Sequence, residues 1–159
     1  MLKKLTGTTD DLSLTILRVT LGAVMFPHGA QKVLGWFGGY GFGPTLDAFT
    51  TQMGIPAPLA LLAFAAEFLG GLGLIVGLFG RVAAFGVLSV MSVAATLHLR
   101  NGFFMNWTGA QGGEGYEYHL LAGALALAVI IKGSGAWSLD RRLSPDTTVV
   151  DRAALARAA

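Results

Sequence analysis

The chain alternates long apolar stretches with short segments rich in glycine and polar residues. The apolar stretches cover residues 12–34, 58–79, 82–99 and 117–137. A helix needs about 20 mostly apolar residues to cross a bilayer. The last stretch is the weakest, because its fully apolar part is only Leu120–Ile131, and it reaches spanning length only if residues 116–137 are counted. This pattern predicts an all-α integral membrane protein, an antiparallel four-helix bundle.

Composition supports the membrane class and excludes several kinds of chemistry. The chain is 53% hydrophobic and 13% charged, whereas soluble domains carry about 25% charged residues. A net charge of +2 is too small to indicate a nucleic-acid partner, so the expected partner is the lipid bilayer. The chain has no cysteine, which excludes disulfides, thiol redox chemistry and thiolate metal sites. Any redox role must therefore rest on a cofactor, a substrate or a partner subunit.

Basic residues mark one side of the predicted bundle. With four spans, that side carries Lys3, Lys4, Arg81, Lys132, Arg141 and Arg142. The connections 35–57 and 101–116 fall on the other side and contain few basic residues. The positive-inside rule then predicts that both termini are cytoplasmic. We expect residues 1–143 to form the transmembrane domain, with an uncleaved polar lead over residues 1–11, and residues 144–159 to form a cytoplasmic tail.

Glu67 is the most informative single residue, because it lies in the middle of the second apolar stretch. A carboxylate at the centre of a membrane helix costs about 2.5–3.5 kcal/mol on insertion scales. Such acids face the interior of a bundle and have partners, which makes Glu67 a candidate functional residue. The alternative is a structural acid tied to a cation on another helix.

The first apolar stretch carries Arg18, His28 and Lys32. Lys32 is near the end of the stretch and Arg18 is about one turn inside the opposite end, so both side chains can snorkel to an interface. His28 is deeper and shares one helical face with Gln31 and Lys32. We expect that face to look into the bundle. The alternative for His28 is a hydrogen-bonded core histidine.

Counting residues at 1.5 Å each places most of the polar groups in the outer half of the bundle. They are His28, Lys32, Glu67, His98, Arg100, Glu117 and His119. Arg18 alone falls clearly on the cytoplasmic side and is interpreted as a structural cation. Antiparallel packing predicts that the outer groups surround one polar pocket beneath two aromatic connections. Satisfaction of each polar group by its own neighbours is the alternative.

Such a pocket suits several functions. A quinone-like ring needs apolar walls, a donor such as histidine for its oxygens, and an acid such as Glu67 to supply protons. Three histidines and a carboxylate also suit a metal, but no ligand-spacing motif is present, so we assign no metal ligand. A proton or solute transporter and a non-catalytic subunit that docks a redox partner remain as alternatives.

Several short motifs carry a resemblance over about residues 14–142. They are Arg18, Phe26-Pro27-His28-Gly29 with Lys32, Gly54-Ile55-Pro56, Glu67-Phe68-Leu69-Gly70-Gly71 with Gly77, His98, Asn101-Gly102-Phe103-Phe104-Met105-Asn106-Trp107, Gly115-Tyr116-Glu117-Tyr118 and Ser138-Leu139-Asp140. Through them the chain resembles the DoxX family of small four-helix bacterial membrane proteins, in its oxidoreductase-associated branch. The resemblance implies a plasma-membrane location and a link to quinone or thiosulfate-type redox systems, or to detoxification of aromatic compounds.

By position, the resemblance singles out Arg18, His28, Lys32, Glu67, His98 and Glu117, while His119 stands where an apolar residue is usual. We therefore predict a multi-pass component of the bacterial inner membrane that binds a quinone-like molecule and works with a soluble or membrane redox partner protein. The sequence leaves open whether the chain is itself an enzyme and whether it forms a homo-oligomer. The candidate catalytic residues are Glu67, His28 and Glu117, and the candidate cofactor-binding residues are His28, Lys32, Glu67, His98, Arg100, Asn106, Trp107 and His119.

Overall fold

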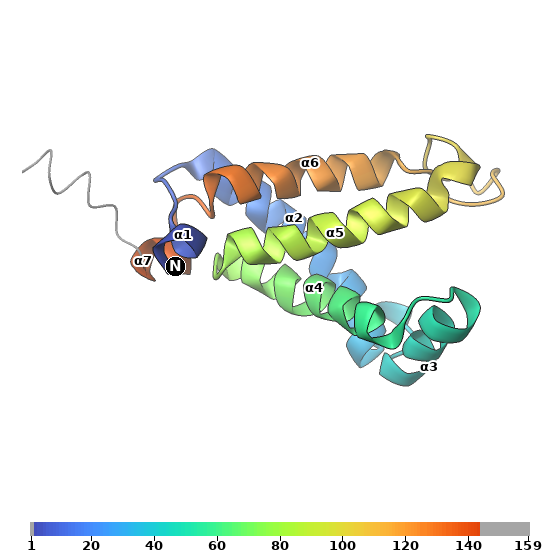
Figure 1. Ribbon diagram of the computed structural model, residues 1–159. Coiled ribbons are helices and arrows are strands. Elements are labelled where there is room, and N and C mark those ends of the chain that lie inside the picture. The colour runs from blue at the N-terminus through green and yellow to red at the C-terminus, as the bar shows by residue number, and fades with distance from the viewer. Residues whose placement is uncertain (1, 144–159) are drawn as a thin grey trace, which may run out of the picture.

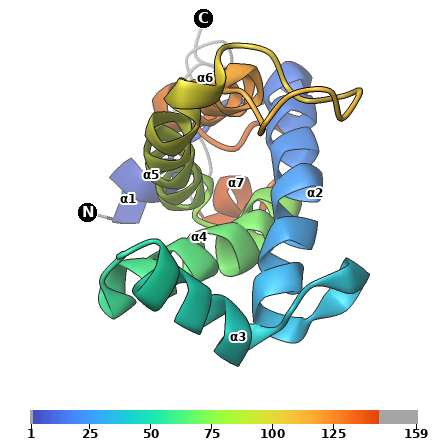
Figure 2. The ribbon, with the colours of Figure 1, turned by 90° about the vertical axis from the view of Figure 1, so that its right-hand side faces the viewer.

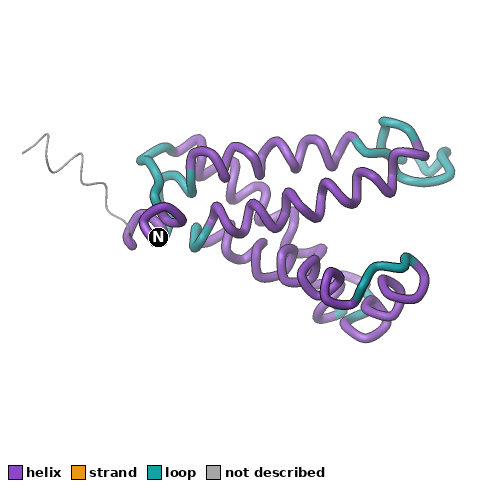
Figure 3. Tube along the Cα trace, viewed as in Figure 1, coloured by secondary structure: helices purple, strands orange, loops and turns teal. Residues whose placement is uncertain are grey.

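Four long helices form most of the structure, a computed structural model that describes residues 2–143. They are α2 (Leu12–Leu34), α4 (Ala57–Val76), α5 (Gly80–His98) and α6 (Glu117–Lys132). They pack in a ring in which α2 contacts α4, α4 contacts α5, α5 contacts α6 and α6 returns to α2 (Figures 1 and 2). Residues 2–143 contain no strand (Figure 3), which confirms the all-α prediction.

Shorter helices cover the two ends of the ring. At one end lie α1 (Leu2–Thr6) and α7 (Leu139–Leu143), close to each other (Figure 1). At the other end lie α3 (Phe42–Asp47), a π-helical turn (Ala48–Gln52) and two 3-10 turns (Trp36–Gly38 and Leu99–Asn101). The predicted tail, residues 144–159, is outside the described residues, as is Met1.

The helices bury a narrow apolar core and leave a broad apolar outer surface. The core consists of Leu21, Met25, Leu74, Ala84, Val87, Met91, Ala122, Ala126 and Val129. Large apolar side chains such as Ile16, Leu62 and Phe85 are more than half exposed, and an apolar surface of this extent indicates a membrane environment. Three helices, α2, α4 and α5, are long and apolar enough to cross a bilayer.

Glycines bring α2 and α4 into backbone contact. A Cβ atom on Gly22 would lie 2.7 Å from the Gly71 carbonyl oxygen, and one on Gly71 would lie 2.8 Å from the Phe26 nitrogen. Real Cβ atoms do not approach backbone atoms so closely, so a larger residue would force the helices apart. Gly71 is one helical turn from Glu67, so the close approach of α2 lies beside this acid.

Two of the predicted spans end earlier as helices than expected. The stretch 58–79 is helical only to Val76, because Gly77 adopts the left-handed conformation (φ 71°) and caps α4. The stretch 117–137 is helical only to Lys132, and Gly133 and Gly135 both have positive φ. With 16 residues, α6 is about 24 Å long, and the buried segment 133–136 continues beyond it without being helical.

Candidate functional site

Glu67 forms an ion pair with Lys32 across the α2–α4 contact. The Lys32 Nζ atom lies 2.5 Å from the Glu67 Oε2 atom and also donates to the His28 carbonyl at 3.3 Å. The Glu67 side chain is 7% exposed and that of Lys32 is 21% exposed. Side chains lean toward the N-terminus of their helix, which directs Glu67 to the end of the bundle where Lys32 lies. Glu67 is therefore paired with a cation on another helix, which is the structural alternative that the sequence left open.

His28 and Tyr118 lie beside this ion pair. Their ring centres are 6.4 Å apart, and the Lys32 Nζ atom of the pair lies 3.3 Å from the His28 carbonyl oxygen. The His28 side chain is exposed. The Tyr118 hydroxyl donates only to the Met25 sulfur, at 3.6 Å, which is a weak acceptor. His28, Lys32, Glu67 and Tyr118 thus form one polar group, here called the ion-pair cluster, between α2, α4 and α6.

His98 and His119 form a second group between α5 and α6. Their rings stack with centres 4.9 Å apart and planes at 26°. The Nδ1 atom of His98 lies 3.0 Å from the Glu114 carbonyl oxygen. His119 is buried, and among residues 2–143 its Nδ1 atom has no hydrogen-bond partner. The His119 ring also contacts that of its neighbour Tyr118, with centres 5.6 Å apart, so the histidine pair adjoins the ion-pair cluster.

The connection between α5 and α6 engages the other predicted acid, Glu117. Its Oε1 atom accepts hydrogen bonds from the Met105 nitrogen at 2.9 Å and the Trp107 Nε1 atom at 3.2 Å. The Asn106 side chain bonds within the same connection, to the backbone of Gln111. Arg100 is exposed, and no ion pair between it and Glu117 is present among residues 2–143. Glu117, Asn106 and Trp107 thus hold the connection in shape.

The structure therefore places the predicted outer residues at one end of the bundle, but in separate groups. Lys32, Glu67 and His28 meet, and so do His98 and His119. Two surface hollows were identified there. The first lies between α5 and α6 and includes His119 in its lining, while the second, near the 38–45 connection, includes Lys32. Residues 2–143 contain no group of three or more His, Cys, Asp or Glu side chains that could hold a metal ion.

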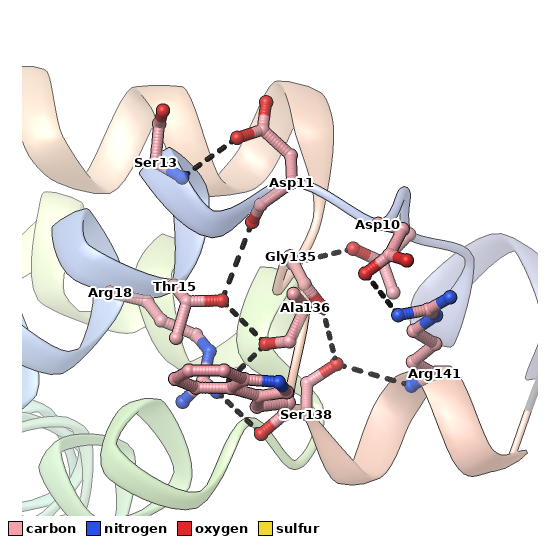
Figure 4. A network of polar contacts seen from close by, with 11 residues as sticks. Asp10, Asp11, Ser13, Thr15, Arg18, Gly135, Ala136, Ser138 and Arg141 are labelled. Carbon is pink, nitrogen blue, oxygen red and sulfur yellow. Dashed lines mark hydrogen bonds and ion pairs between the residues drawn. The ribbon is translucent and has the colours of Figure 1, made fainter.

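Arg18 occupies the opposite end of the bundle and does not snorkel. It is 1% exposed and donates to backbone carbonyl oxygens only. Those oxygens belong to Leu74 and Ile75 in the last turn of α4 and to Ser134, Ala136 and Trp137 beyond α6. Figure 4 shows Arg18 beside Thr15 and Ala136 in this network. The predicted structural role of Arg18 agrees with these contacts, but the predicted route to the interface is wrong, because the carbonyl oxygens hold the side chain inside.

Asp140 and Tyr118 belong to motifs that carry the resemblance, but the sequence interpretation assigned neither of them a role in a site. Asp140 is 1% exposed and accepts from the Phe79 nitrogen at 2.7 Å, the Gly80 nitrogen at 2.8 Å and the Ser134 hydroxyl at 2.5 Å. It therefore caps the start of α5 from 60 residues away. Tyr118 could have been noticed because it precedes His119 in a predicted span, where two adjacent polar rings face two different helices.

The chain was compared with protein families, curated proteins and solved structures. The family model described as DoxX matches residues 13–100, which is more than half of the 159 residues. No curated protein and no solved structure matches the chain. The matched part contains both members of the Lys32–Glu67 ion pair, His28 and His98, and it ends before α6. The chain belongs to the DoxX family of membrane proteins.

Proposed function

We propose that this chain is a component of a membrane redox system that binds a quinone-like or small aromatic redox molecule in the outer half of its bundle. The observation that carries the proposal is the ion pair between Lys32 and Glu67 inside a helix bundle, with His28 and Tyr118 beside it. Ionisable groups are expensive in a membrane helix, and they concentrate where a protein binds ligands or moves protons. Membership of the DoxX family agrees with an oxidoreductase-related role.

The ion-pair cluster supplies the groups that such a reaction needs. Reduction of a quinone to a quinol takes up two electrons and two protons. His28 and Tyr118 offer donors for the two ring oxygens, and Glu67 can exchange a proton at its carboxylate while Lys32 holds it in place. The electrons must come from a redox partner protein, soluble or in the membrane, because the chain has no cysteine and the proposal assigns it no metal.

We also propose that α6 and the segment 133–137 together make a fourth crossing, so that both termini are cytoplasmic in a bacterial plasma membrane. The described ends of the chain, α1 and α7, lie at the same end of the ring (Figure 1). Lys4, Arg81 and Arg141 lie at that end, in agreement with the positive-inside rule. Non-helical backbone is tolerated at membrane depth only where protein buries it and satisfies its polar groups. Thr15 and Arg18 do this for the Ala136 carbonyl oxygen.

The absence of cysteine makes this topology directly testable. Thr9→Cys and Thr108→Cys each place one thiol on an exposed residue, at opposite ends of the ring. We expect a membrane-impermeant maleimide to label Thr108→Cys in intact cells and Thr9→Cys only after the membrane is opened. Labelling of both thiols in intact cells, or only of Thr9→Cys, would contradict the proposed orientation.

Quinone binding by the purified protein tests the proposed function itself. The full chain in nanodiscs is extracted for bound quinone, and its affinity for a short-chain benzoquinone is measured over a range of pH. Glu67→Gln should weaken binding about 10-fold and remove its pH dependence, since the amide holds neither the charge nor the proton. Asp47→Asn, which neutralises an exposed carboxylate on α3, is the matched control and should change neither quantity.

The outcome also separates the proposal from its main competitor, an accessory subunit without chemistry of its own. A preparation that carries no quinone and binds none when it is added favours the accessory function. Equal affinity and equal pH dependence in the wild type and Glu67→Gln would show that the ion pair is only structural. Quinone binding that is lost in Glu67→Gln and kept in Asp47→Asn supports the proposal.

A further inference from the structure

A groove between α5 and α6 is bordered by His119 of the histidine pair. Its volume is about 240 Å³. Its lining is formed by Leu88, Met91, Ser92, Ala95, His119, Leu120, Gly123, Ala124 and Leu127. The small residues on both helices leave the space, and the leucines and Met91 form apolar walls. The groove opens on the outer surface of the bundle, where the exposed apolar side chains indicate lipid.

His119 provides the polar group of this groove. The other polar side chain in the lining is Ser92, whose hydroxyl already donates to the Leu88 carbonyl at 2.8 Å. The Nδ1 atom of His119 is sealed inside the protein, and the described part of the chain offers it no hydrogen-bond partner. His119 lines the groove, so we take Nε2 as the ring nitrogen that faces it. We assign the neutral tautomer with its proton on Nδ1, in which Nε2 is an acceptor that a hydroxyl donor on an occupant satisfies.

The His119 ring is held in place before any occupant arrives. His98 stacks against it, and the contact between the His98 Nδ1 atom and the Glu114 carbonyl fixes the orientation of His98. On its other side, Tyr118 packs edge-on against the His119 ring at 78°. A ring restrained on two sides loses little side-chain freedom when it binds a ligand, which favours affinity for small molecules.

The volume sets the size of the occupant. An apolar protein cavity of about 150 Å³ accommodates benzene, and sites for drug-sized molecules begin at about 300 Å³. A groove of about 240 Å³ therefore suits one substituted aromatic ring. Apolar walls exclude a charged ligand, because no side chain in the lining carries an opposite charge to compensate for its lost hydration.

We propose that the α5–α6 groove binds a small lipophilic phenol, the chemical class that includes the head group of a quinol. The phenol hydroxyl donates to the Nε2 atom of His119, and the ring lies against Met91 and Leu120. A redox role for the bound phenol rests on the proposed function. His119, which would hold a quinol here, is the neighbour of Tyr118 in the ion-pair cluster. The site itself depends only on the groove and on His119.

Binding of a matched pair of probes to the full chain in nanodiscs tests this site. The probes are para-propylphenol and its methyl ether, which have similar apolar surfaces but differ in the hydroxyl donor. Protein-free nanodiscs give the partition into lipid, which is subtracted. The wild type should bind the phenol about 3- to 10-fold more tightly than the ether, and His119→Phe, which keeps an aromatic ring for stacking, should abolish that preference.

A groove-filling variant distinguishes this site from others on the molecule. Ala124→Phe places a ring inside the groove from an exposed position, and we expect it to weaken binding of both probes about 10-fold or more. Ala65→Phe adds the same ring to an exposed position on α4 outside the groove and should leave both affinities unchanged.

Each result supports or overturns the site, separately from the proposed function. Ala124→Phe binding like Ala65→Phe, or a wild type without preference for the phenol, overturns the site even if quinone binds elsewhere on the chain. The site stands, and the proposed function fails, if the phenol binds in the groove while no quinone or quinol does. A wild type that binds a benzoquinone but no phenol overturns the site alone.

Discussion

The two ends of the bundle both contain buried ionisable groups, but they satisfy them differently. At the end where α1 and α7 lie, Arg18 and Asp140 are each 1% exposed. Their hydrogen bonds connect segments that are far apart in the sequence. At the opposite end Lys32 and Glu67 pair in a partly exposed position, and His28 is exposed. Within residues 2–143, one nitrogen of His119 has no hydrogen-bond partner. One end is a closed network, and the other retains free hydrogen-bonding capacity.

Under the proposed function, this difference assigns stability of the fold to one end of the bundle and ligand binding to the other. Helices that end inside a bilayer leave carbonyl oxygens without partners, and lipid cannot replace water as a donor. Arg18 supplies donors at the end of α4, and Arg81 does the same for the Ile130 and Ile131 carbonyls at the end of α6. The closed end thus completes the fold. At the open end His28 is exposed, and the proposed function uses it to bind a ligand.

The largest expected effect is at the closed end. Arg18→Met leaves carbonyl groups of Leu74, Ile75 and Ser134 buried without donors, and each buried unsatisfied group costs about 1–3 kcal/mol. We expect a loss of about 4 kcal/mol or more, which corresponds to a fall in Tm of about 10 °C or more for a chain of this size. Thermal unfolding of the purified protein in detergent micelles measures it.

Arg18→Lys provides the control for charge. The ammonium has a single nitrogen and cannot reach α4 and the segment 133–137 together, so we expect a Tm between those of the wild type and Arg18→Met. If Arg18→Met melts within a few degrees of the wild type, the closed network does not determine stability. If Arg18→Lys has the same Tm as the wild type, the positive charge is sufficient and the several donors of the guanidinium are not needed.

The fold was largely predictable because lipid imposes a simple rule on sequence. Apolar stretches of helix length gave α2, α4, α5 and α6, and charge asymmetry gave their expected direction. The helix ends were less predictable, since Gly77 and Gly133 end helices inside apolar stretches that hydropathy treats as continuous. The segment after Gly133 is held by Arg18, a residue 116 positions away from Ser134, and a local pattern cannot contain such a contact.

The sequence predicted at which end of the bundle the candidate site residues lie, but not which of their side chains meet. Counting residues along antiparallel helices placed His28, Glu67 and His119 toward the same end, where the structure has them. Which side chains meet depends on the rotation of each helix about its axis, and that is set by glycine contacts such as Gly22 with Gly71. A lone carboxylate in an apolar stretch allowed a cation on another helix as its partner, and in the structure that cation is Lys32.

The next effect in size is at the open end. Lys32→Met leaves the Glu67 carboxylate buried without its cation, and removing one partner of a fully buried pair costs about 3–5 kcal/mol. Because the Lys32 side chain is 21% exposed, we expect a smaller loss of about 2–3 kcal/mol in the free energy of unfolding. The double variant Lys32→Met with Glu67→Met should recover to within about 1 kcal/mol of the wild type.

That double variant sharpens the comparison between the two ends. Quinone binding measured on it should be lost although the protein is stable, since the groups proposed to hold and protonate the ligand are gone. Replacements at Arg18 should not abolish quinone binding in a protein that stays stable, because we assign that end to the stability of the fold. A double variant that is stable and binds quinone normally would contradict the assignment of function to the open end.

The smallest expected effects compare one carboxylate from each end. Both carboxylate oxygens of Asp140 accept hydrogen bonds, from Phe79, Gly80 and Ser134. In Asp140→Asn the amide NH2 group would face at least one of these donors. We expect the free energy of unfolding to fall by about 1–2 kcal/mol. Glu117→Gln keeps the one oxygen that accepts from Met105 and Trp107 and should cost less than about 0.5 kcal/mol. Tm values of the two variants, measured side by side, show which carboxylate contributes more to stability. Equal losses would mean that the connection over the open end is as tightly built as the closed end, and the contrast between them would then rest on His119 and the ion pair alone.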